Sequence, residues 1–167
     1  MTADDVSLST LLLSFFALIL ASAYFSSSET GMMSLNRYRM NHLRRSNHPG
    51  AVRASRLLEK PDKLIGVILI GNNFVNFLAA SIATSIAVII LGEPAPIATA
   101  VVLTLIVLIF AEVTPKTIAA LYPEKIAYPS SMLLGFLEID TARSLYGDSV
   151  FQDEMWIHDL NVRYNLD

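Results

Sequence analysis

Long segments without a charged residue constrain this chain more than any other feature of its sequence. No Asp, Glu, Lys or Arg occurs from Val6 to Ser28 or from Leu64 to Leu91. A helix needs roughly 20 apolar residues to cross the hydrocarbon core of a bilayer, which is about 30 Å thick. Charged residues make up only 16% of the chain, against roughly 25% in a typical soluble domain. The sequence therefore predicts an all-α integral membrane protein in a lipid bilayer.

We predict three transmembrane helices, at about residues 6–28, 64–91 and 97–121. The string GEPAP at residues 92–96 separates the last two, because glycine and proline interrupt helices and favour turns. A secretory signal peptide is the alternative for the first segment, since the string ASA at residues 21–23 resembles a cleavage site. However, no basic residue precedes this apolar stretch, as a signal peptide requires. The transmembrane prediction is therefore preferred.

The basic residues predict how the chain is oriented in the membrane. Eight of the twelve Lys and Arg residues lie between residues 32 and 63. Short loops rich in Lys and Arg stay in the cytoplasm, so this segment is expected inside and the N-terminus outside. Tyr38, Leu43 and Leu57 lie among the arginines, a pattern typical of two amphipathic juxtamembrane helices on the inner membrane surface. A solvated cytoplasmic loop is the alternative.

A fourth apolar stretch, residues 129–137, is too short to cross the membrane. It ends where Glu138 and Asp140 introduce charge, and the following sequence is polar. We therefore predict a membrane domain at residues 1–137, with this truncated fourth segment at its end. Residues 138–167 are expected to form a divergent polar tail.

Polar side chains inside the predicted membrane helices are the candidate functional groups, because such groups are costly in lipid and are retained for function. All of the candidates carry oxygen: Ser26, Ser27, Ser28, Asn72, Asn73, Asn76 and Glu112. Asn76 lies four residues after Asn72 and three after Asn73, which predicts a shared helical face for the three amides. Hydroxyl, amide and carboxylate oxygens suit hard cations such as Mg²⁺. The chain has no cysteine, so a thiolate metal site is excluded.

Pro115 predicts an irregularity in the third transmembrane helix. A proline has no backbone N–H, and its ring clashes with the carbonyl four residues earlier, which here belongs to Ala111. We expect the helix to break there and to expose carbonyl oxygens beside Glu112. Transporters hold ions at such interrupted helices, because unwound backbone supplies oxygen ligands at membrane depth.

Each motif also has a structural interpretation that the sequence leaves open. Serines in membrane helices can permit close packing or bond to their own backbone, and amides can join helices. Glu112 can form an ion pair with Lys116, four residues later, at the membrane edge. These interpretations need no bound ion.

Three strings at these motifs resemble the CNNM/CorC family (cyclin M), and closely its bacterial CorB-type members: YFSSSETGMMSLNRYRM, KPDKLIGVILIGNNFVN and FAEVTPKTIAALYPEKIAYPSS. The resemblance extends from roughly Leu11 to Leu134. It implies a homodimer in the bacterial inner membrane that transports Mg²⁺, commonly as an exporter. It also implies that the three motifs converge on an ion site, with Pro115 as a kink and with Gly31 and Gly71 allowing close backbone approach.

Members of this family usually continue into a cytoplasmic helical segment and a CBS-domain pair that binds ATP. The absence of such sequence here predicts a truncated membrane domain with no ATP-binding region. The resemblance implies Mg²⁺ as the transported ion. Co²⁺ is a second candidate ion. The alternative function is a non-transporting membrane anchor or accessory subunit, or an inactive fragment. The chain contains no enzymatic signature and no basic run with aromatics of the kind that binds nucleic acid, so neither activity is expected.

Overall fold

The computed structural model describes residues 7–92, 101, 102 and 104–146. Within these residues every regular element is a helix, which confirms the all-α prediction. Three helical segments are long and apolar enough to cross a membrane: Leu8–Met33, Pro61–Ile90 and Thr104–Leu121. The three predicted transmembrane helices are therefore present, and they imply a lipid bilayer as the environment. The predicted turn at residues 92–96 lies almost wholly outside the described residues.

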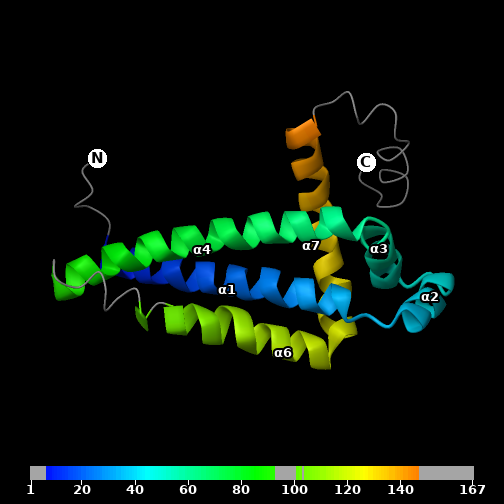
Figure 1. Ribbon diagram of the computed structural model, residues 1–167, viewed down its shortest axis with the longest axis horizontal. Coiled ribbons are helices and arrows are strands. Elements are labelled where there is room, and N and C mark those ends of the chain that lie inside the picture. Colours follow the sequence, from blue (N-terminus) through cyan, green and yellow to red (C-terminus); the bar gives the residue numbers. More distant parts are fainter. Residues whose placement is uncertain (1–6, 93–100, 103, 147–167) are drawn as a thin grey trace.

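Helices α1 (Leu8–Met33) and α4 (Pro61–Leu91) lie side by side along the long axis of the molecule (Figure 1). The third span runs alongside them and consists mainly of η2 (Val107–Val113) and α6 (Thr114–Leu121). Large apolar side chains on these helices are widely exposed, including Phe77 at 77%. A continuous surface of exposed apolar side chains is unfavourable in water, but it is compatible with contact to lipid.

The basic segment forms two short helices, α2 (Arg37–Arg45) and α3 (Pro49–Leu57), as predicted. The side chains of Asn36 and His48 cap these helices by accepting hydrogen bonds from backbone N–H groups, which satisfies donors that have no partner within the helix. Asn47 lies between them with φ at 57°, a left-handed conformation that asparagine tolerates. The caps and this turn explain why the segment folds as a helical hairpin rather than as one helix.

The last described helix, α7 (Pro123–Tyr146), lies crosswise to the three membrane helices (Figure 1). Helix α7 continues without a break past residue 137, where we expected the membrane domain to end. The predicted apolar stretch 129–137 forms the middle of this helix. The predicted polar tail, 138–167, therefore begins as helix, while residues 147–167 lie outside the described part. Once a helix is nucleated, each further residue adds a hydrogen bond, so a change from apolar to polar side chains does not by itself end it.

A buried core joins these elements at the end of the bundle where α1 ends and α4 begins. Five different helices contribute to it, through Met32, Met40, Leu57, Leu64 and Leu134. Leu64 and Leu134 are fully buried. This core holds the crosswise helix α7 and the hairpin of α2 and α3 against the membrane helices.

The third membrane helix is not broken at Pro115, contrary to the prediction. The chain stays helical, and the irregularity takes the form of the π-helix η2, in which the Thr114 N–H donates to the Ile109 carbonyl five residues earlier. A π-helix has a wider turn than an α-helix. Pro115 follows directly in the first turn of α6, and it has no N–H to continue the hydrogen-bond ladder. Helices α1 and α4 are also continuous through their serine and asparagine motifs, so the predicted ion site at broken helices is not formed in that way.

Replacing Gly71 with alanine is expected to destabilise the pairing of α4 with α1. A Cβ atom at Gly71 would lie 2.7 Å from Cε1 and Cζ of Phe25 on α1, whereas a Cβ at Gly66 would meet no atom within 4 Å. Overpacking of this kind costs about 1–3 kcal/mol, more than the ~1 kcal/mol that alanine contributes over glycine in a helix. We therefore expect Gly71→Ala to lower the thermal unfolding temperature in detergent.

Gly66→Ala in the same helix is the matched control, and it should leave the unfolding temperature unchanged or raise it. Equal changes for the two variants would contradict the packing that is described for Gly71.

Candidate functional site

The polar side chains near the end of α1 divide between two faces of the helix. Ser22, Ser26 and Glu29 are spaced by four and three residues, so they lie on one face. At about 100° per residue, Ser27 and Ser28 turn away from that face. Ser27 instead lines a cavity of about 460 Å³ between α1 and α7. The consecutive serines of the motif therefore do not share one environment.

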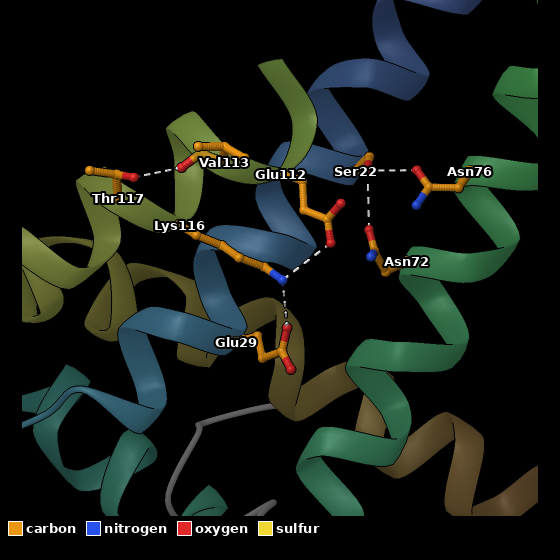
Figure 2. A network of polar contacts seen from close by, with 8 residues as sticks. All are labelled: Ser22, Glu29, Asn72, Asn76, Glu112, Val113, Lys116 and Thr117. Carbon is orange, nitrogen blue, oxygen red and sulfur yellow. Dashed lines mark hydrogen bonds and ion pairs between the residues drawn. The ribbon is translucent and has the colours of Figure 1, made fainter. Parts of the chain in front are cut away.

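Ser22 forms a polar contact between α1 and α4, although it was not among the predicted ligands. Its Oγ donates to Asn76 Oδ1 at 2.7 Å and to Asn72 Oδ1 at 3.1 Å (Figure 2). The two amide oxygens thus point toward the same hydroxyl. Three oxygen atoms converge here. Only the Ser22 hydroxyl carries a proton, so a single hydrogen lies among the three oxygens. Such a cluster of lone pairs can bind a hard cation.

Ser26 lies one helical turn from Ser22 on the same face of α1. Its side chain is 1% exposed, and among the described residues its Oγ has no hydrogen-bond partner. A buried hydroxyl without a partner costs about 1–3 kcal/mol. Ser26 therefore offers a further oxygen beside the cluster of Ser22 and the two amides, available to a ligand.

The other predicted ligands do not join this cluster. Ser27 Oγ donates to the Tyr24 carbonyl of its own helix at 3.1 Å, which is the structural role that serines often play in membrane helices. Ser28 is fully buried, and within the described residues its Oγ has no partner, but it belongs to the other side of α1. Asn73 is exposed. Only two of the three amides therefore face α1, because one residue of helix rotates Asn73 away.

The glycines expected to allow close approach do lie against other helices. Gly71 faces the Phe25 ring, and a Cβ atom at Gly31 would lie 3.3 Å from Cγ2 of Ile126 on α7. These contacts set the rotation of α1 between α4 and α7. That rotation decides which of its serines face the amides.

A group of three charged side chains lies beside the hydroxyl and amide cluster. Lys116 Nζ lies 3.3 Å from Glu112 Oε1 and 3.8 Å from Glu29 Oε2, so the ion pair between Glu112 and Lys116 that the sequence left open is present. The Glu112 carboxylate points toward Ser22 and Asn72 (Figure 2). Glu29 was not among the predicted ligands, although it belongs to the serine motif.

The charges of this group favour a cation. Glu29 and Glu112 with Lys116 carry a net charge of −1, and their side chains are 28%, 43% and 37% exposed. No cluster of three or more His, Cys, Asp or Glu occurs within the described residues.

A signal for Ser22 exists in the sequence but was assigned to another feature. Ser22 precedes Ser26 by four residues, as Asn72 precedes Asn76. Two polar pairs with the same spacing on neighbouring membrane helices can face each other over one turn. The sequence string around Ser22 was considered only as a cleavage site, so this match was missed.

Known proteins have sequences similar to this one. A family model described as the cyclin M transmembrane N-terminal domain matches residues 13–141. The UPF0053 inner membrane protein YfjD of Escherichia coli is 56% identical over 118 residues, which cover 71% of this chain and 28% of YfjD. A UPF0053 protein of Haemophilus influenzae is 44% identical over 131 residues, 78% of this chain and 31% of that protein.

A more distant relative extends the comparison to plants. A chloroplastic DUF21 domain-containing protein of Arabidopsis thaliana is 31% identical over 107 residues, 64% of this chain and 16% of that protein. The chain thus spans less than a third of the length of these relatives. The family model nevertheless covers most of this chain, and it includes all three polar motifs. This chain belongs to the family of cyclin M transmembrane N-terminal domains.

Proposed function

We propose that this chain is the membrane domain of a cation transporter and that Mg²⁺ is its ion. The observation that carries the proposal is the convergence of oxygen atoms from Ser22, Asn72 and Asn76 between two membrane helices. Glu112 supplies a negative charge beside them. Polar groups at this depth are costly unless they serve a function, and together these oxygens match the ligands that Mg²⁺ prefers.

Five side chains form the proposed ligand set: Ser22, Ser26, Asn72, Asn76 and Glu112. Mg²⁺ takes about six oxygens at about 2.0–2.1 Å and gives up water reluctantly, so water or a backbone carbonyl completes the shell. This set replaces the expected one, because Ser27, Ser28 and Asn73 do not face the cluster. The Ser22 hydroxyl needs only to rotate its proton away for three oxygens to face the ion.

Transport in this proposal uses a homodimer whose halves move against each other to open the site to either side of the inner membrane. The N-terminus lies outside and residues 32–63 lie in the cytoplasm. The location of the exposed basic helix α2 at one end of the bundle supports this orientation, since basic segments stay inside. The relative YfjD is described as an inner membrane protein. The proposal includes no enzymatic step, because binding and release of an ion need no covalent chemistry.

One observation favours the second candidate, a membrane anchor or accessory subunit that moves no ion. Lys116 contacts both Glu112 and Glu29, so the two carboxylates have a partner even without a metal. Measurements of Mg²⁺ flux in liposomes distinguish the two functions, since the anchor predicts no flux above that of empty liposomes.

Ser22→Ala tests the proposed ligand set. We expect this variant to bind Mg²⁺ about tenfold more weakly, a change of ~1.4 kcal/mol, because one oxygen ligand is lost while the helix is kept. The measurement is the rise in thermal unfolding temperature of the purified chain as Mg²⁺ is titrated, together with Mg²⁺ flux in liposomes.

Ser27→Ala is the matched control, since it removes a hydroxyl from another face of the same helix. It should respond to Mg²⁺ as the unchanged chain does. If both serine variants respond alike, the assignment of Ser22 as a ligand is wrong. If the unchanged chain shows neither stabilisation nor flux, the proposed transport function is wrong.

A further inference from the structure

We propose that Lys116 is a tethered cation that competes with the transported ion for Glu112, and that Glu29 receives the lysine when the ion binds. This inference rests on the proposed function, because it concerns how the same ion site is filled and emptied. It assigns a role to two side chains, Lys116 and Glu29, that the proposed ligand set does not use.

The position of the ammonium group between two carboxylates is the first observation. Lys116 Nζ donates a hydrogen bond to Glu112 Oε1 at 3.3 Å, while Glu29 Oε2 lies 3.8 Å away, within ion-pair distance but beyond hydrogen-bond distance. Figure 2 shows the ammonium between them, with the carboxylates reaching it from different helices. The flexible four-carbon stem of lysine allows a small rotation to exchange the two partners.

The two carboxylates are not equivalent toward the ion. The Glu112 side chain points toward Ser22 and Asn72 (Figure 2). Glu29 lies seven residues after Ser22 on α1, which is about 10.5 Å along the helix. An ion held at Ser22 and the two amides would therefore lie about two helical turns from Glu29, whereas the Glu112 carboxylate points toward these residues (Figure 2). Glu29 stays available to the ammonium.

Electrostatic repulsion couples binding of the ion at Glu112 to movement of the Lys116 ammonium toward Glu29. A divalent ion on Glu112 would share that carboxylate with the Lys116 ammonium, and like charges at this separation repel strongly at partly buried positions. Movement of the ammonium to Glu29 separates the two cations and leaves each carboxylate paired with a cation. In the absence of the ion, Lys116 returns to Glu112. Its positive charge then lowers the electrostatic free energy of the empty, negatively charged site. The lysine therefore weakens ion binding and so promotes release.

The test measures Mg²⁺ affinity from thermal unfolding of the purified chain, at constant ionic strength, in three variants. Lys116→Gln removes the competitor and should bind Mg²⁺ about tenfold more tightly, while Glu29→Gln removes the alternative partner and should bind about tenfold more weakly. In the double variant, the effect of Glu29→Gln should disappear, because no ammonium remains to be relocated. Such non-additivity is the sign of a coupled pair.

Two controls separate this role from general effects of charge or folding. Lys116→Arg keeps the positive charge and should retain the lower affinity of the unchanged chain. Lys125→Gln removes a lysine whose ammonium lies 5.0 Å from the centre of the Tyr122 ring, and it should leave Mg²⁺ affinity unchanged. If Glu29 attracts the ion only through space, Glu29→Gln will weaken binding equally with and without Lys116, and the proposal is wrong.

The outcomes also distinguish this inference from the function on which it rests. If the unchanged chain responds to Mg²⁺ but Lys116→Gln binds Mg²⁺ more weakly, Lys116 supports the site instead of competing for it, and only the inference is overturned. If neither the unchanged chain nor Lys116→Gln responds to Mg²⁺, both the inference and the proposed function fail.

Discussion

Replacing Glu112 with glutamine is expected to abolish both the stabilisation of this chain by Mg²⁺ and its Mg²⁺ flux in liposomes. Glutamine keeps the size of the side chain and one oxygen atom but removes the negative charge. A divalent cation that leaves water needs that charge, since amide and hydroxyl dipoles alone compensate only part of the lost hydration. We expect the affinity for Mg²⁺ to fall by more than about 100-fold, which corresponds to ~2.8 kcal/mol or more.

Glu124→Gln is the control for the loss of a carboxylate. Glu124 on α7 forms an ion pair with Arg39 on α2 at 2.8 Å, away from the three charged side chains of the site. Its replacement should leave the response to Mg²⁺ unchanged. A Glu112→Gln or Glu112→Ala variant that keeps stabilisation and flux would show that the ion does not use Glu112, and the site would have to be sought elsewhere.

Replacing Leu134 with alanine is expected to give the largest loss of folding stability among the changes considered for this chain. Leu134 is fully buried in the core that joins α7 to the other helices. Removal of a fully buried leucine side chain leaves a cavity and costs about 2–5 kcal/mol. The measurement is the free energy of unfolding in detergent, and the unfolding temperature should fall clearly.

The neighbouring residue supplies the control. Leu133 is 49% exposed, so Leu133→Ala removes a similar volume from the surface and should cost less than about 1 kcal/mol. If the two leucine variants lose stability equally, α7 does not pack against the bundle through the face that bears Leu134.

The elements of the fold could be predicted because a bilayer leaves a chain few choices. Backbone groups in lipid must find partners within their own helix, so the uncharged segments beginning near Val6 and Leu64 had to be helical. The basic segment 32–63 was equally informative, since amphipathic spacing is a local feature. The length of α7 was not predicted, because the change from apolar to polar residues at Glu138 gives no information on where the helix ends.

The site could be predicted only as a set of motifs. Sequence spacing placed Asn72 and Asn76 together, but it did not reveal that Ser22 would face them in place of Ser27. The choice between serines depends on the rotation of α1, which is set by contacts such as that of Phe25 with Gly71. No property of a single helix contains this information.

The sequence by itself determined that three apolar helices cross a membrane with a basic helical hairpin at one end, because hydrophobic length and charge act on each segment separately. The tertiary structure decided which polar atoms meet. It formed a π-helix just before Pro115, where a break was expected, brought Ser22 to the two amides, and placed Lys116 between two carboxylates. These features depend on how helices rotate and pack against one another, and that relation arises only when the whole bundle is assembled.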